Sequence, residues 1–283
     1  MTSEPLAPAP APIRVPEPAP PTTLLPAGPE TGTAVVLGPV MPRWDGGVFF
    51  GEIAEPLLAS GHRVLVYDTL SLLEGGDDLA ALADRWAGVI TAAGPVDLLA
   101  GNALGGAIVQ TLLTRAWTHR ARVLLLSGPT VADAALDTEL ERIAAAAEHD
   151  GLPAALRLLD DVVRHPGRSP AAPATASRGD GAAGRRLATG LRLLHGADAG
   201  RAVRDFPGEL LHVYGTRSRL VGRRHLVAAA HHQVVGIADA GMRPHADRPD
   251  ATRRAVARFL ATPRPPAPTG PASPRTLSKE DDS

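Results

Sequence analysis

Short apolar runs alternate with helical segments along most of this chain, and this alternation limits the fold more than any other feature. Continuous runs of this kind are typical of strands that are covered on both faces. The predicted strands lie at 33–38, 63–68, 96–100, 121–127, 209–215 and 233–237. Helices are predicted between and after them, near 47–60 and 78–93, from Ala107 to Trp117, and from Pro249 to about Ala261. Repeated strand–helix units require right-handed crossovers, so we predict an α/β fold with a mostly parallel, doubly wound sheet.

Proline marks both ends of the chain. Residues 1–30 hold ten prolines, and residues 263–283 hold six more. We predict a disordered tail at each end, because such segments bury too little apolar surface to offset the entropy of ordering. The rest divides into an α/β core, 31–132 and 206–262, and an insertion at 133–205.

The insertion is predicted to be helical and rich in loops. Apolar residues recur at helical spacing over 133–165, which predicts a pair of helices that cap the core. Residues 166–184 are rich in Pro, Ala, Gly and Ser and are predicted to form a loop. Eight arginines but only two acids lie between 164 and 204, so this region is locally basic. It could attract a carboxylate, a phosphopantetheine arm or an acidic carrier protein, and a solvated surface is the alternative.

Composition excludes several classes of function. The formal net charge is −1, so no field of the whole chain favours nucleic acid or an anionic membrane. Cysteine is absent, which excludes disulfides and thiolate metal sites. We find no metal-ligand spacing, phosphate loop or dinucleotide fingerprint, and we therefore expect no metal and no cofactor. The apolar runs are too short to span a membrane and no secretory signal is evident, so the expected location is cytoplasmic.

A glycine-rich turn, Gly101-Asn102-Ala103-Leu104-Gly105-Gly106, joins the predicted strand at 96–100 to the helix after it. This is the context of the motif Gly-x-Ser-x-Gly, in which a sharp turn exposes the central side chain above a parallel sheet. The backbone N–H of the next residue then helps to form an oxyanion hole. Ala103 stands where the serine would be, and a methyl group cannot attack a substrate.

Four passages carry the landmarks of one superfamily in its own order. Leu58 to Asp68 look like its helix–Gly–His–x–Val passage into a strand, and the glycine-rich turn follows. Residues 214–221 are similar to its Gly-x-x-Asp-x-Leu-Val loop, and 240–250 to its Gly-His-x-Pro-His-x-Glu-x-Pro-Glu loop. Over roughly 32–262 the chain therefore resembles the α/β-hydrolase superfamily, with a lipase- or esterase-like core and a helical cap. The first two strands of that superfamily are not evident.

The resemblance implies a Ser-His-Asp triad at positions where this chain has other residues. Ala103 stands at the nucleophile position, Ser218 at the acid position and Met242 at the histidine position. None of them can reproduce the proton transfers of a triad, so ordinary ester hydrolysis is not expected. His245 and Asp133 are the candidates for relocated acid–base residues. Their alternatives are a loop-packing residue for His245 and a helix N-terminal residue for Asp133.

Backbone donors survive side-chain substitution. The resemblance implies that the N–H of Leu104 and one from the loop at 39–44 can still hold a carbonyl oxygen. The residues predicted to bind substrate are Val40, Arg43, Trp44, Asn102 and Leu104. Packing is the alternative for Trp44, and a solvated surface position is the alternative for Arg43.

These features predict a cofactor-free, non-hydrolytic enzyme of the cyclase, lyase or isomerase type. It would act on a small acyl or polyketide-like substrate in biosynthesis, because oriented binding and oxyanion donors can act without a nucleophile. The alternative is an inactive pseudoenzyme that binds a ligand or partner. A third interpretation is a weak hydrolase with a relocated triad.

Overall fold

The computed structural model describes residues 18–165 and 180–263. Predictions that concern residues 1–17, 166–179 and 264–283 lie outside this described part. Within it, no helix has both the length and the apolar content that a membrane span needs. The cytoplasmic location stays a prediction.

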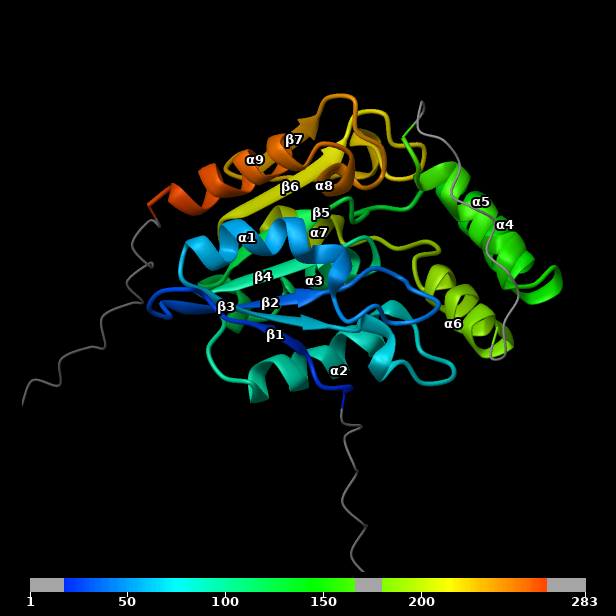
Figure 1. Ribbon diagram of the computed structural model, residues 1–283, viewed down its shortest axis with the longest axis horizontal. Coiled ribbons are helices and arrows are strands. Elements are labelled where there is room, and N and C mark those ends of the chain that lie inside the picture. The colour runs from blue at the N-terminus through cyan, green and yellow to red at the C-terminus, as the bar shows by residue number, and fades with distance from the viewer. Residues whose placement is uncertain (1–17, 166–179, 264–283) are drawn as a thin grey trace, which may run out of the picture.

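A seven-stranded sheet runs through the molecule in the order β1-β3-β2-β4-β5-β6-β7 (Figure 1). The strand β1 pairs antiparallel with β3, and all the other neighbours pair parallel. This sheet confirms the predicted α/β class. The strands are β1 (Thr22–Leu24), β2 (Gly32–Leu37), β3 (His62–Tyr67), β4 (Leu98–Asn102), β5 (Arg122–Leu126), β6 (Leu210–Gly215) and β7 (Gln233–Ile237).

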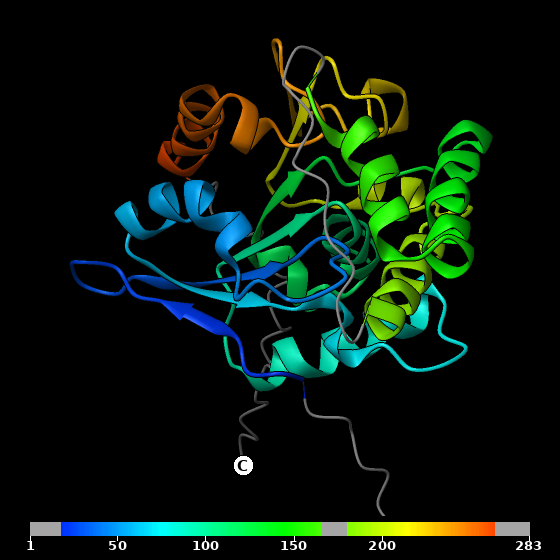
Figure 2. The same cartoon turned by 45° about the vertical axis from the view of Figure 1, so that its right-hand side comes forward.

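Helices cover both faces of the sheet. One face carries α1 (Gly51–Ala59) and α9 (Pro249–Ala261), which pack against each other (Figures 1 and 2). The other carries α2 (Leu79–Ala92) and α3 (Leu104–Leu112). Large side chains fill both layers, and burial of each stabilises the fold by roughly 1.5–3 kcal/mol. The largest fully buried ones include Phe50, Ile53, Leu57, Trp86, Ile90, Phe206 and Phe259.

The strand β1 lies within the stretch that the sequence predicts as a tail. Its three residues pair with Val64, Leu65 and Val66 of β3, and Thr22 Oγ1 donates to the carbonyl of Gly46 at 2.7 Å. The tail prediction is therefore wrong for this segment. Pairing with a preformed sheet edge stabilises three residues that are too few to give a periodic signal.

Three helices between β5 and β6 form the cap: α4 (Ala134–His149), α5 (Leu152–Val163) and α6 (Asp180–Arg192). Figure 2 shows them together at one end of the sheet. The predicted helix pair matches α4 and α5. Residues 180–184, predicted as loop, are instead the first turn of α6, because Ala183, Leu187 and Leu191 bury one apolar face. The domain boundaries themselves stay predictions.

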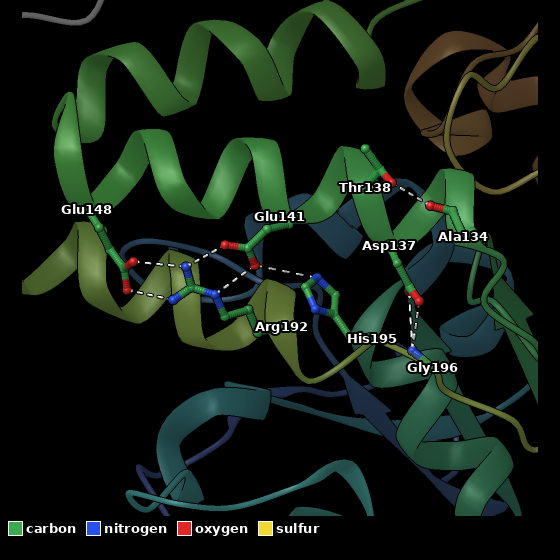
Figure 3. A network of polar contacts seen from close by, with 8 residues as sticks. All are labelled: Ala134, Asp137, Thr138, Glu141, Glu148, Arg192, His195 and Gly196. Carbon is green, nitrogen blue, oxygen red and sulfur yellow. Dashed lines mark hydrogen bonds and ion pairs between the residues drawn. The ribbon is translucent and has the colours of Figure 1, made fainter.

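A guanidinium group joins two of the cap helices (Figure 3). Arg192 of α6 donates to Glu141 at 2.8 and 2.9 Å and to Glu148 at 2.6 and 2.9 Å, both on α4. These hydrogen bonds lower the pKa of both glutamates. Two bidentate pairs on one arginine restrict the geometry far more than a single surface ion pair does.

The remaining elements are short. The helix α7 (Gly200–Asp205) leads into β6, and α8 (Pro244–Asp247) lies between β7 and α9. The 3₁₀ turns are Val48–Phe50, Thr69–Leu72, Ala116–Arg120 and Arg223–His225. In parallel sheets of this kind, the loops at the carboxyl ends of the strands form the binding crevice.

Candidate functional site

A cavity of about 720 Å³ lies where the carboxyl ends of the central strands face the cap. Asn102, Ala103 and Pro129 contribute from the strand ends, and Val40 and Met41 from the loop after β2. The cap supplies a mostly apolar wall of Leu136, Leu140, Leu156, Leu159, Leu191 and Leu194. The cavity therefore suits a small, mainly apolar ligand.

The glycine-rich turn has the sharp shape that its sequence predicts. Ala103 adopts φ 48° and ψ −111°, a conformation that costs a residue with a Cβ roughly 1–3 kcal/mol. A Cβ on Gly101 would lie 2.4 Å from the carbonyl oxygen of Gly105. A Cβ on Gly105 would lie 2.1 Å from the carbonyl oxygen of Leu37. Only glycine allows α3 to approach β2 and β4 so closely, and the approach presents Ala103 to the cavity.

Two backbone N–H groups of the residues around the cavity are available as donors. Leu104 is the first residue of α3, so its N–H has no partner within the helix. Val40 follows Pro39 in the loop after β2 and lines the cavity. Neither N–H donates a hydrogen bond to any described residue. Such a pair can stabilise the negative charge that develops on a carbonyl oxygen under attack.

The three positions assigned by resemblance to a triad lie at this edge of the sheet. Ala103 and Met242 both line the cavity. The hydroxyl of Ser218, in the loop after β6, contacts the Met242 sulfur at 3.6 Å. The loops after β4, β6 and β7 thus bring Ala103, Ser218 and Met242 to one region.

His245 also lines the cavity, from α8. Its side chain is 4% exposed, and its Nδ1 is buried without a hydrogen-bond partner among the described residues. Burial lowers the pKa of this imidazole to about 4; the charge of Arg243 acts in the same direction and Asp247 opposes it. The ring is therefore neutral near pH 7 and keeps a lone pair that can accept a proton.

Asp133 lies outside the cavity lining. Its carboxylate accepts the N–H of Leu136 at 2.8 Å as the N-cap of α4 and pairs with Arg224 at 2.8 Å. The hydrogen bonds from Arg224 and then Leu136 hold the pKa of Asp133 well below its usual range. The Nε2 of His225 lies 3.1 Å away. The structure thus places Asp133 at the helix terminus, and its acid–base role stays a prediction.

The residues predicted to bind substrate divide into two groups. Val40 and Asn102 line the cavity, and fully buried Leu104 contributes its backbone. Arg43 instead pairs with Asp180 at 2.7 Å, and the ring of Trp44 packs edge-on against Phe49 with centroids 6.2 Å apart. Neither of these two side chains belongs to the cavity lining.

Sequence reasoning missed the cavity residues Met41, Arg157 and Arg243. The only available signal for Arg243 was its place two residues before His245. Arg157 lies on α5, whose helical spacing predicts the helix but does not show which charged residue faces a cavity.

The helix α6 holds the loop that carries Val40. Arg186 donates from Nε to the carbonyl of Met41 at 2.9 Å and pairs through Nη2 with Asp68. A Cβ on Gly190 would lie 2.8 Å from the Val40 side chain, so helix and loop are in close contact. One of the two backbone donors is therefore positioned by the cap.

The described residues hold no group of three or more His, Asp or Glu side chains suited to a metal ion. The absence of metals and cofactors stays a prediction. The other buried histidine of note, His212 of β6, is fully covered and lies outside the cavity lining; burial lowers its pKa to about 3.

Comparison with known proteins identifies structural neighbours only. No protein-family model and no curated protein matches the chain. The structure is similar to MGS-M2, an α/β hydrolase enzyme from a Medee basin deep-sea metagenome library, with a TM-score of 0.69, 11% identity, and coverage of 86% of this chain and 94% of that chain. It is similar to a thermophilic esterase from Thermogutta terrifontis (TM-score 0.60, 17% identity, coverage 86% and 98%). A third similar structure is a meta-cleavage product hydrolase from Pseudomonas fluorescens IP01 (TM-score 0.64, 16% identity, coverage 82% and 91%).

These neighbours contradict the function predicted from the sequence. That prediction is a cyclase, lyase or isomerase, with an inactive binding protein as its alternative, whereas the neighbours are named as hydrolases and esterases. The physical reason for the correction is that hydrolysis needs an attacking water, a base and oxyanion donors, and does not strictly need a side-chain nucleophile. At these identities the comparison establishes architecture, and the chain has the α/β-hydrolase fold.

Proposed function

We propose that this chain hydrolyses small, mainly apolar carboxylic esters by direct attack of water. The observation that carries this proposal is the occurrence, around one apolar cavity, of a preserved strand–turn–helix elbow and a buried neutral imidazole. The elbow and the loop after β2 each supply one donor for the carbonyl oxygen, and the imidazole supplies a base.

Ala103, Ser218 and Met242 occupy the triad positions in this proposal. The methyl side chain of Ala103 cannot form a covalent acyl-enzyme, so water takes the place of the nucleophile. The contact between Ser218 and Met242 supports this assignment, because acid and histidine are neighbours in a working triad.

The ester carbonyl is bound by the N–H groups of Leu104 and Val40. His245 accepts a proton from water as the water oxygen attacks the carbonyl carbon. The tetrahedral intermediate then expels the alkoxide, which takes the proton back from the imidazolium, and a carboxylic acid and an alcohol result. A positioned general base contributes typically about 10²–10⁴ in rate, so this enzyme is expected to be slow.

The comparisons support the reaction class, since the neighbours named above are hydrolases or an esterase. The solved structure of the meta-cleavage product hydrolase is a serine-to-alanine variant complexed with acetates. An α/β-hydrolase fold with such a replacement therefore still binds small carboxylates in that protein.

The test is a hydrolysis assay with p-nitrophenyl acyl esters of increasing chain length. We expect wild-type protein to exceed the buffer rate and His245→Asn to lose at least about tenfold in kcat/KM. The matched control is His231→Asn, because His231 lies outside the cavity lining. Circular dichroism and thermal melting verify the folding of each variant.

A serine-reactive fluorophosphonate separates the two hydrolytic mechanisms. We expect no covalent labelling of the wild-type protein. Labelling of any serine, or the absence of ester hydrolysis at every chain length, would overturn direct attack by water.

A further inference from the structure

Two arginines that line the cavity have no partner in the described part of the chain. Arg157 extends from α5, and Arg243 precedes α8. Neither guanidinium makes a hydrogen bond or ion pair with a described residue. By contrast, Arg186 and Arg192 of α6 both bind carboxylates.

The carboxylates at the same cavity are already engaged. Asp160 and Asp161 of α5 both pair with Arg164, at 3.4 and 2.8 Å. Arg219 adds another positive charge, because it donates to the backbone carbonyl of Asp161 at 2.9 Å. Arg157 and Arg243 are therefore not neutralised by the acids beside them.

The positive charge of Arg243 acts on the cavity residue His245, because it adds to the effect of burial in lowering the pKa of that imidazole. A bound anion would offset that charge. Guanidinium groups bind carboxylates through paired, charge-assisted hydrogen bonds, which a neutral ester group cannot form. The leucine wall that the cap supplies to the cavity suits a hydrocarbon segment between the carboxylate and the ester group.

We propose that the preferred substrates are esters whose acyl chain ends in a free carboxylate, as in monoesters of dicarboxylic acids. Arg157 and Arg243 bind the remote carboxylate, the leucines of the cap contact the methylene chain, and the ester carbonyl lies at Ala103. This inference rests on the proposed hydrolytic function and adds the class of substrate.

A matched pair of substrates tests it: the mono-p-nitrophenyl ester of adipic acid and p-nitrophenyl hexanoate. The two acyl chains have equal length and differ in the terminal carboxylate. We expect wild-type kcat/KM to favour the anionic ester by about a hundredfold, because each of the two guanidinium groups contributes about tenfold through a charge-assisted hydrogen bond. Sodium chloride at about 0.5 M should reduce this preference, because salt screens the attraction.

Variants assign the preference to residues. Arg157→Gln and Arg243→Gln should each lower the ratio of kcat/KM for the anionic over the neutral ester by about tenfold. The control Arg185→Gln, on the exposed side of α6, should keep the wild-type ratio. Hydrolysis of both esters at equal efficiency, with the same ratio in all variants, would overturn the inference and leave the proposed function intact.

Calorimetry measures binding to the two arginines without requiring hydrolysis. The monoamide of adipic acid, which keeps one free carboxylate, should bind wild-type protein more tightly than neutral hexanamide of the same chain length, and Arg157→Gln should reduce the difference. If neither ester is hydrolysed but binding of the monoamide depends on Arg157, the anion site stands and the hydrolytic proposal fails. If the monoamide and hexanamide bind equally or not at all, the anion site is refuted.

Discussion

Restoring the side chains of a triad gives the strongest test of the assignment of positions 103, 218 and 242. The perturbation is the triple variant Ala103→Ser, Ser218→Asp and Met242→His. In the structure Ser218 Oγ lies 3.6 Å from Met242 Sδ. A histidine Nδ1 is as many bonds from Cα as this sulfur, and an aspartate oxygen extends one bond beyond a serine Oγ. The substituted pair can therefore reach a hydrogen bond of about 2.8 Å without backbone movement.

The expected gain in turnover has an upper limit, and it should depend on all three substitutions together. In a comparable hydrolase, loss of the whole triad costs about 10⁶ in turnover, or about 8 kcal/mol of activation free energy. The elbow and both backbone donors are already in place here, so we expect at least about 10² over the parent protein. Each single substitution should raise turnover only slightly, because triad members act as a unit.

The assay combines hydrolysis of p-nitrophenyl butyrate with fluorophosphonate labelling. The triple variant should show a burst of product and label at position 103. The matched control carries Ser218→Asp and Met242→His but keeps Ala103, and it should show neither. If the folded triple variant is no faster than this control and remains unlabelled, these positions are not those of a triad.

Three further predictions concern pH and the loop after β2. Burial lowers the pKa of His245 to about 4. We therefore expect kcat/KM to be constant from about pH 8 to about 5 and to fall only as the imidazole is protonated near pH 4. A pH profile of kcat/KM with its midpoint near 6.5 would refute the role of this base. The pKa of His212 is lowered to about 3, so the unfolded chain binds protons first. As the pH falls below 6.5, the free energy of unfolding by urea should therefore decrease by up to about 1.4 kcal/mol per pH unit for each of His245 and His212. A free energy of unfolding that does not change over this range would contradict the burial of both imidazoles in the neutral form. Finally, Arg186→Gln should lower kcat/KM for p-nitrophenyl butyrate by about tenfold, because Arg186 positions the loop that carries Val40, while Arg185→Gln should not; equal rates in the two variants would show that Arg186 does not position the loop.

Much of the fold could be predicted because local signals agree with tertiary contacts. The last helix begins at Pro249 and ends at Ala261, as its sequence indicates, because proline suits the first turn. The glycine-rich turn is equally specific, since its spacing fixes where helix and strand can touch. By contrast, β1 depends on pairing with a strand far along the chain, and the start of α6 depends on burial against α4.

The site was less predictable because sequence does not show where side chains point. Val40 and Trp44 lie in one loop, yet Val40 lines the cavity and Trp44 packs against Phe49. Asp133 and His245 both follow strands of the sheet. The helix that begins after Asp133 provides N–H groups that engage its carboxylate, whereas burial leaves Nδ1 of His245 without a described partner.

The cap is fastened to the core on two sides, and this has a consequence for folding cooperativity. On one side Arg186 joins α6 to the loop after β2. On the other, the end of α5 accepts hydrogen bonds from Arg219 and from the N–H of Met242, in the loops after β6 and β7. Because α4 is bound to α6 through Arg192, the cap cannot detach from one side alone without breaking charged contacts. Cap and core should therefore melt in a single transition, with the amides of α4 exchanging at rates close to those of the central strands.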